Sequence, residues 1–266
     1  MNNLVFGKYI PIKSPIHDLD PRAKIAALFV MIASVFIPKS WWCYLLLAVV
    51  ILTVVLMSHI KIKMILKALK PTFFMLTFLL IINCLTVKTG DIFFYLFKYP
   101  IYKDAIFNTL FIVVRLLLMI MLTTIITATT KPLDLTLGIE SLLSPLKVVK
   151  FPYHEIAMMI SIALRFIPTI IEETMRIMNS QKSRGVDFEE GKLKEKITAV
   201  LSLIIPLFTV AFQRAFELAD AMEARGYVPD QERTKYRTLH FNLKDGLFLA
   251  GAHIILALMI LSRFYL

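Results

Sequence analysis

Two arginine-glycine pairs are the residues of this chain whose type and spacing indicate chemistry. Gly185 follows Arg184, Gly226 follows Arg225, and the two arginines stand 41 positions apart (225 − 184). A planar guanidinium group can hold a carboxylate or backbone carbonyls through two hydrogen bonds, and glycine lets another backbone approach closely. If both pairs face the same aqueous compartment, they are suited to dock two copies of one partner.

Each pair stands at the end of a run of helix-favouring sequence. Glycine after the last helical residue is a common C-terminal cap because it tolerates a left-handed backbone, and a cation there suits the helix dipole. The residues immediately before the arginines, Ser183 and Ala224, are small. We therefore expect two narrow helix tips, each with a fixed positive charge that can enter a groove.

Composition places these tips on a membrane protein. Hydrophobic residues make up 58% of the chain, and its mean hydropathy is +0.73. A membrane-spanning helix needs about 17 to 25 mostly apolar residues. The first candidate span is long enough only if Ala23 and Lys24 extend it, with the lysine amine reaching back to the membrane surface. The five predicted spans are 25–38, 41–58, 71–87, 104–130 and 246–262.

The basic residues orient these spans. Residues 1–24 and 59–70 contain eight Lys and Arg side chains, whereas the short loops on the opposite side contain four. Because basic loops stay in the cytoplasm, we expect the N-terminus in the cytoplasm and the C-terminus outside. The net charge of +11 then fits the anionic lipid of the inner membrane surface, and nucleic acid is not expected as a partner.

The region between the fourth and fifth spans contains two more apolar stretches. Residues 154–178 and 197–212 each contain a proline and are followed by charged sequence. If 197–212 crossed the bilayer alone, Arg184 and Arg225 would lie on opposite sides of it. We therefore expect long helices that lie along or partly in the inner leaflet, apolar toward lipid or a membrane partner. Two ordinary spans with proline kinks are the alternative.

Four segments together resemble one protein family. They are QKSRG at 181–185, MEARGY at 222–227, SPIHDLDPR at 14–22 and LRFIP at 164–168. With them the chain resembles, through nearly its whole length, the transmembrane T component (EcfT) of energy-coupling factor (ECF) transporters. Ser183 stands where the usual motif has alanine, which exchanges one small residue for another.

The resemblance implies a fold and a division of the chain. The expected fold is an all-α polytopic integral membrane protein with about five transmembrane helices and long cytoplasmic or interfacial coupling helices. The expected parts are four N-terminal spans in 1–130, a coupling-helix region in 131–244 and a C-terminal span in 245–266.

The resemblance also implies a non-catalytic coupling subunit in a bacterial cell membrane. Such a subunit joins two cytoplasmic ABC-type ATPase subunits to a membrane-embedded, substrate-binding S component, and it transmits ATP-driven motion for the uptake of vitamins or other micronutrients. A T component shared by vitamin S components is expected here rather than one dedicated to cobalt or nickel. The residues expected to dock the ATPases are Ser183, Arg184, Gly185, Ala224, Arg225 and Gly226.

Two other transporter classes remain as alternatives. A substrate-translocating permease of another ABC importer usually couples through one short helix, and a secondary transporter needs buried carboxylates, which the five spans lack in their interiors. The chain has no GxxxxGK[ST] phosphate loop, and His154-Glu155 lacks the second histidine of a zinc hydrolase. Catalytic residues, cofactors and metal ions are therefore not expected.

Other features predict structural contacts. Arg115 is an ionisable residue inside a predicted span, so it needs a partner, for which a carboxylate or the carbonyls of a helix end are expected; a substrate pathway is the alternative. Asp20 before Pro21 predicts the N-cap of the first long helix. Cys43 and Cys84 have no metal-binding spacing and are expected to be packing residues.

Overall fold

The computed structural model describes residues 9–38, 40–96, 99–145, 152–188, 190–228 and 239–265. Three lysines of the charge count, Lys8, Lys39 and Lys98, lie outside these residues. Within them the chain forms eight helices and one antiparallel hairpin. In chain order these are α1 (Pro21–Phe36), α2 (Trp41–Met57), α3 (Ile62–Thr86), β1 (Ile92–Leu96), β2 (Tyr99–Tyr102), α4 (Lys103–Thr129), α5 (Pro132–Leu143), α6 (Tyr153–Ser183), α7 (Leu193–Ala224) and α8 (Leu243–Tyr265).

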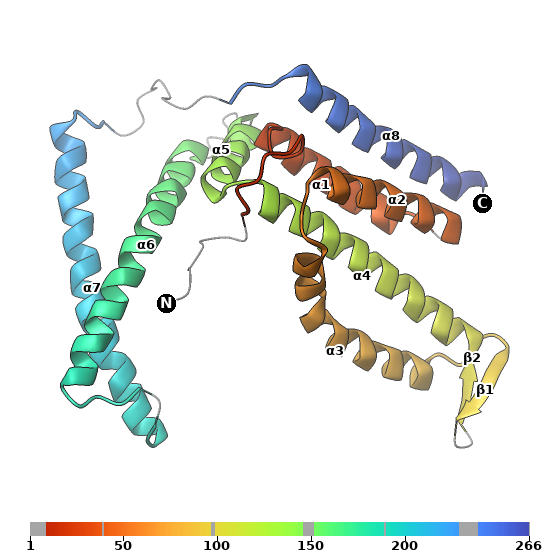
Figure 1. Cartoon of the computed structure of the whole chain (residues 1–266), viewed down its shortest axis with the longest axis horizontal. Coiled ribbons are helices and arrows are strands. Elements are labelled where there is room, and N and C mark those ends of the chain that lie inside the picture. Colours follow the sequence, from red (N-terminus) through yellow and green to blue (C-terminus); the bar gives the residue numbers. More distant parts are fainter. Residues whose placement is uncertain are drawn as a thin grey trace. The chain divides into compact units, whose positions relative to one another are not determined.

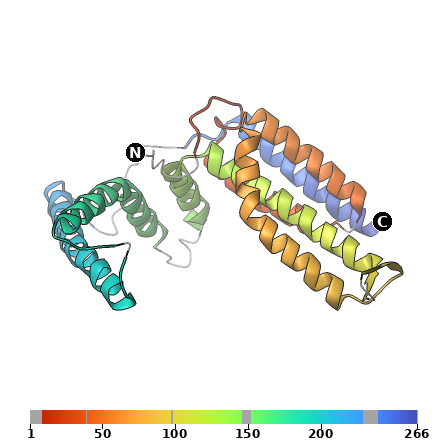
Figure 2. The same ribbon diagram turned by 60° about the horizontal axis from the view of Figure 1, so that its bottom comes forward.

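The chain divides into two compact units. The first comprises Met1–Tyr153 and Leu239–Leu266, and the second comprises His154–Thr238. In the first unit, α1, α2, α4 and α8 run alongside one another (Figure 1 and Figure 2). The second unit consists of α6 and α7. The chain therefore leaves the first unit after α5 and returns to it just before α8.

The interior of the first unit is apolar, and α2 shows how the sequence builds it. Tyr44, Leu47, Ile51 and Val55 follow one another at a spacing of three or four residues, so they share one helix face, and all four are buried. The opposite face of α2 exposes large apolar side chains such as Trp42. Apolar residues on both faces are typical of a helix that packs against protein on one side and lipid on the other.

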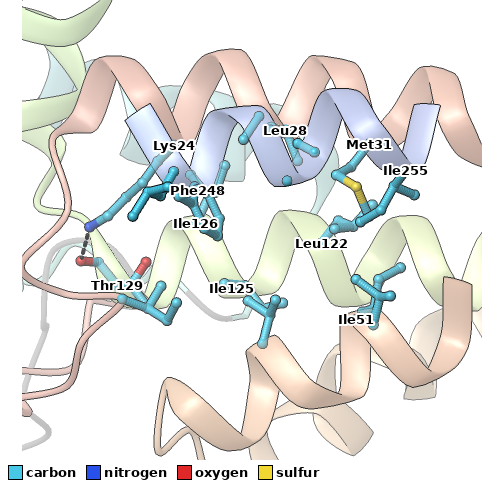
Figure 3. A pocket seen from close by; sticks show the side chains of 17 residues that line it. Lys24, Leu28, Met31, Ile51, Leu122, Ile125, Ile126, Thr129, Phe248 and Ile255 are labelled. Carbon is cyan, nitrogen blue, oxygen red and sulfur yellow. Dashed lines mark hydrogen bonds between the residues drawn. The ribbon is translucent and has the colours of Figure 1, made fainter. Parts of the chain in front are cut away.

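A cavity of about 300 Å³ lies within this interior and is bounded by α1, α2, α4 and α8 (Figure 3). Its wall is apolar except near Lys24 and Thr129. The prediction that Lys24 reaches the membrane surface is wrong, because its side chain turns inward and the residue is only 3% exposed. Its ammonium group instead donates to the Thr129 carbonyl at the end of α4 over 3.3 Å.

Five of the described helices are long and apolar enough to cross a membrane, namely α3, α4, α6, α7 and α8. The chain is thus an all-α polytopic membrane protein, as predicted. The individual helices differ in part from the predicted spans. The stretches 25–38 and 41–58 form helices of only 16 and 17 residues, whereas α6 and α7 continue through their prolines to 31 and 32 residues.

Arg115 has a structural partner inside the first unit. One of its terminal nitrogens donates to the Tyr44 hydroxyl over 2.9 Å, and that hydroxyl lies 3.2 Å from the Pro38 carbonyl oxygen. The guanidinium carbon also stands 5.4 Å from the centre of the Phe36 ring. The direct partner is thus a hydroxyl and not the expected carboxylate or helix-end carbonyls, and this hydroxyl connects the cation to the Pro38 carbonyl just beyond α1.

The N-cap prediction for α1 is confirmed. The Asp20 carboxylate accepts from the Arg22 backbone N–H over 2.8 Å, and Pro21 occupies the first helical position. Cys43 is buried as expected, and Cys84 is partly buried.

We expect the substitution Tyr44→Phe to destabilise the protein by about 2 kcal/mol, because the half-buried guanidinium group of Arg115 loses a hydrogen bond. In detergent this should lower the melting temperature by roughly 5 °C. The matched control is Tyr102→Phe, at a hydroxyl that has no hydrogen-bond partner among the described residues. Equal melting temperatures for the two variants would show that the Arg115 contact contributes nothing to stability.

Candidate functional site

The first arginine-glycine pair forms the end of α6. The N–H of Gly185 donates to the carbonyl of Lys182 over 3.0 Å, and the N–H of Val186 donates to the carbonyl of Gln181 over 3.1 Å. These two hydrogen bonds, together with a left-handed residue directly after the capping residue, make a Schellman cap. Gly185 supplies the left-handed conformation with a φ of 85°, and Arg184 is the capping residue just before it.

The end of α7 repeats this geometry. The N–H of Gly226 donates to the carbonyl of Glu223 over 2.8 Å, and the N–H of Tyr227 donates to the carbonyl of Met222 over 2.9 Å. Gly226 has a φ of 71°, and Arg225 is the capping residue. The two pairs are therefore the same structural motif used twice, as the sequence pattern predicted.

The glycines and arginines of both ends are exposed. A Cβ atom placed on Gly185 or Gly226 would meet no atom within 4 Å, so only the backbone conformation of this chain requires glycine there. The guanidinium groups of Arg184 and Arg225 have no hydrogen bond or ion pair with any residue that the structure describes. The adjoining Ser183 and Ala224 are exposed as well. All six residues predicted to dock a partner therefore lie on open helix ends.

The two ends lie far from each other within the second unit. The Arg184 end leads through a short connection into the start of α7, whereas Arg225 follows the last residue of α7 (Figure 1). At about 1.5 Å per residue, the 32 residues of α7 extend over about 48 Å. The two arginines therefore stand at the ends of two different helices.

An ion pair that the sequence analysis did not identify connects α6 to α7. Arg214 of α7 lies 3.8 Å from the carboxylate of Glu173 in α6. The Glu173 side chain is only 16% exposed, and it also pairs with Arg176 over 3.5 Å. Both residues belong to the charged sequence that follows the prolines, but only the crossing of the two helices brings them together.

The second unit has almost no interior of its own. Among their residues, α6 and α7 each bury one, Ala157 and Ala199. Helix α6 is strongly amphipathic, and α7 exposes Phe208, Phe212 and Phe216, which recur every four residues along one face. Helices of this kind need lipid or another protein to cover their apolar faces.

In the described parts of the chain, no three metal-binding side chains lie close enough together to hold an ion.

Known proteins are similar to this chain over almost its full length. A family model described as cobalt transport protein (CbiQ) matches residues 12–236. The energy-coupling factor transporter transmembrane protein EcfT of Bacillus subtilis (strain 168) is 40% identical over 263 residues, which cover 99% of each chain. The protein of the same name from Lactococcus lactis subsp. cremoris is 42% identical over 261 residues, or 98% of each chain. That from Lacticaseibacillus paracasei is 41% identical over 263 residues, or 99% of this chain and 100% of the relative.

We expect Gly185→Ala and Gly226→Ala each to destabilise its helix end by about 1 kcal/mol, because an L-residue resists the left-handed conformation. Amide hydrogen exchange of the last turns of α6 and α7 should become faster. Gly251→Ala is the matched control: it lies within α8 and its Cβ would also meet no atom within 4 Å, so it should not accelerate exchange. Unchanged exchange at both helix ends would mean that the glycine conformation is not required there.

Proposed function

This chain belongs to the CbiQ family of cobalt transport proteins as the transmembrane component of an energy-coupling factor transporter, and on that premise we propose that its two arginine-glycine ends each dock a separate ATPase subunit. The proposal rests above all on the identical, exposed caps at the ends of α6 and α7. Their location at the ends of two different helices favours two partners of one kind, each with its own groove.

The guanidinium groups supply the chemistry of docking. An arginine held at a helix cap is positioned by its backbone, while its side chain keeps all five N–H donors for a partner. A groove on each ATPase that is lined by carboxylate or carbonyl oxygens fits such a tip. The neighbouring Ser183, Gly185, Ala224 and Gly226 are small, so they allow the groove to close around the arginine.

The proposed orientation places both tips in the cytoplasm. It follows from the excess of basic residues in 1–24 and 59–70, which also places the N-terminus in the cytoplasm. In this arrangement 1–130 and 245–266 carry the spans, while the helices of 131–244 lie along or partly in the inner leaflet. Their lengths alone would also allow α6 and α7 to cross a membrane, but two arginines that dock partners of one kind must lie on one side.

The exposed apolar faces of α6 and α7 are the proposed contacts with the S component. Phe208, Phe212 and Phe216 form such a face on α7. When ATP brings the two ATPases together, the docked tips move with them, and the ion pair between Glu173 and Arg214 connects the motion of one helix to that of the other. The surface offered to the S component thereby changes, and a vitamin bound there is released inward.

We expect the double variant Arg184→Glu with Arg225→Glu to lose both ATPase subunits on purification and to abolish vitamin uptake. Each single variant should retain part of the ATPase and transport poorly, because the second tip is intact. Arg263→Glu, a charge reversal at an exposed arginine in the last turn of α8, is the control and should leave both properties unchanged. Normal ATPase copurification with the double variant would disprove the docking role.

The orientation has its own test. In a chain with Cys43→Ala and Cys84→Ala, we expect Ser183→Cys and Ala224→Cys to react with a membrane-impermeant maleimide in inverted vesicles but not in intact cells. The chain is expressed without its partners, so that docking does not protect either position. Labelling of either cysteine from outside the cell would exclude a common cytoplasmic side.

A further inference from the structure

The start of α1 contacts three other segments of the first unit, and these segments have one property in common. These segments are the end of α4, helix α5 and the start of α8. Helices α4 and α5 precede the second unit along the chain, and α8 follows it. The contacts come from residues 14–25, here named the N-terminal clasp. This segment contains the SPIHDLDPR sequence, for which the proposed function provides no role.

The clasp binds the end of α4 through Lys24. Its ammonium group donates to the Thr129 carbonyl over 3.3 Å (Figure 3), to the Thr130 hydroxyl over 3.4 Å and to the His17 carbonyl over 3.1 Å. The last carbonyls of a helix lack partners within the helix, and the helix dipole favours a cation there. Lys24 therefore meets one unpaired carbonyl of α4 and the hydroxyl just beyond that helix, and its third N–H donor binds the His17 carbonyl within the clasp.

The clasp binds the start of α8 through Asp245, which is 2% exposed. One oxygen of this carboxylate accepts from the backbone N–H of Asp20 over 2.7 Å. The other accepts from the backbone N–H of Asn242, also over 2.7 Å. A single carboxylate thus caps the first turn of α8 and joins it to the N-cap residue of α1. Arg22 adds a bond of 3.4 Å to the carbonyl of Leu239.

The third contact is close packing against α5. A Cβ on Gly138 would lie 3.0 Å from the Ile25 Cδ1 atom and 3.1 Å from the Pro21 Cβ atom. A side chain at this position would press on both atoms, so glycine favours the close approach of α5 to the start of α1. The last helix before the second unit and the first residue after it, Leu239, therefore both contact the same short segment.

We infer that the N-terminal clasp positions both chain connections of the second unit and transmits the displacement of α6 and α7 to the membrane helices. This inference rests on the proposed coupling function. Lys24 and Asp245 are its positioning residues, since Lys24 binds the end of α4 and Asp245 joins α8 to the N-cap residue of α1. Without the clasp, the second unit could follow the ATPases while α4 and α8 stayed where they were.

Asp245→Asn tests this role in the complete complex of this chain with its ATPases and an S component. The amide nitrogen cannot accept a hydrogen bond, so one of the two backbone N–H groups loses its acceptor. In proteoliposomes, with radiolabelled riboflavin as the probe, we expect the ATPases to copurify and hydrolyse ATP. The vitamin transported per ATP hydrolysed should fall about tenfold, the factor for one charge-assisted hydrogen bond.

Two further variants separate positioning from stability. Leu47→Ala empties part of the core at a residue that is 0% exposed; it should lower the melting temperature but leave the transport per ATP unchanged. Thr130→Val removes one acceptor of Lys24 and keeps the side-chain shape, so it should assemble even if Asp245→Asn does not, and it should lower the same ratio to a smaller extent.

The amount of vitamin transported per ATP hydrolysed decides whether the inference holds. A wild-type ratio in an assembled clasp variant, or an equal fall in Leu47→Ala, would overturn it and leave the clasp a purely structural element. Failure of the proposed docking would appear differently, as normal ATPase copurification after reversal of Arg184 and Arg225. The experiments therefore distinguish failure of the clasp inference from failure of the docking proposal.

Discussion

The unpaired backbone groups at helix ends are the constraint on which this structure depends. Every helix leaves N–H groups at its start and carbonyls at its end without internal partners, and in apolar surroundings each one must be satisfied. At the end of α4 the partner is a distant side chain, Lys24. At the start of α8 it is Asp245 of the same helix, which also binds the distant N–H of Asp20. At α6 and α7 the chain satisfies its own carbonyls through a left-handed glycine. The first solution fixes helices to one another, and the second leaves a helix end, with its arginine, open to other molecules.

The two solutions also explain which features the sequence predicts. A glycine cap and an aspartate-proline N-cap are local, so the pairs at 184–185 and 225–226 and the cap at Asp20 follow from neighbouring residues. Contacts between distant segments have no such signal. The Arg115 bond to Tyr44 and the Glu173 pair with Arg214 depend on how helices cross. The inward contact of Lys24 has no local signal either, because a lysine near the end of a span is equally typical of one whose amine reaches the membrane surface.

Span assignment illustrates a different limit. Hydropathy identifies apolar helices, but it does not distinguish one that crosses a bilayer from one that rests on it or against a protein. Helices α6 and α7 are long enough to cross, whereas α1 and α2 are shorter than most spans yet form the buried interior with α4. For α6 and α7, the proposal that both ends lie in the cytoplasm rests on the matching arginine ends, because two copies of one motif can bind partners of one kind only on one side of the membrane.

The length of α7 has a mechanical consequence. A helix of 32 residues is about 48 Å long, so a rotation of about 10° around one end displaces the other end by roughly 8 Å. In the proposed mechanism, a small rotation of a docked ATPase at one end of α7 would therefore become a displacement of several ångströms at the other end. A short loop could not produce a displacement of this size, which gives a physical reason for a helix as long as α7.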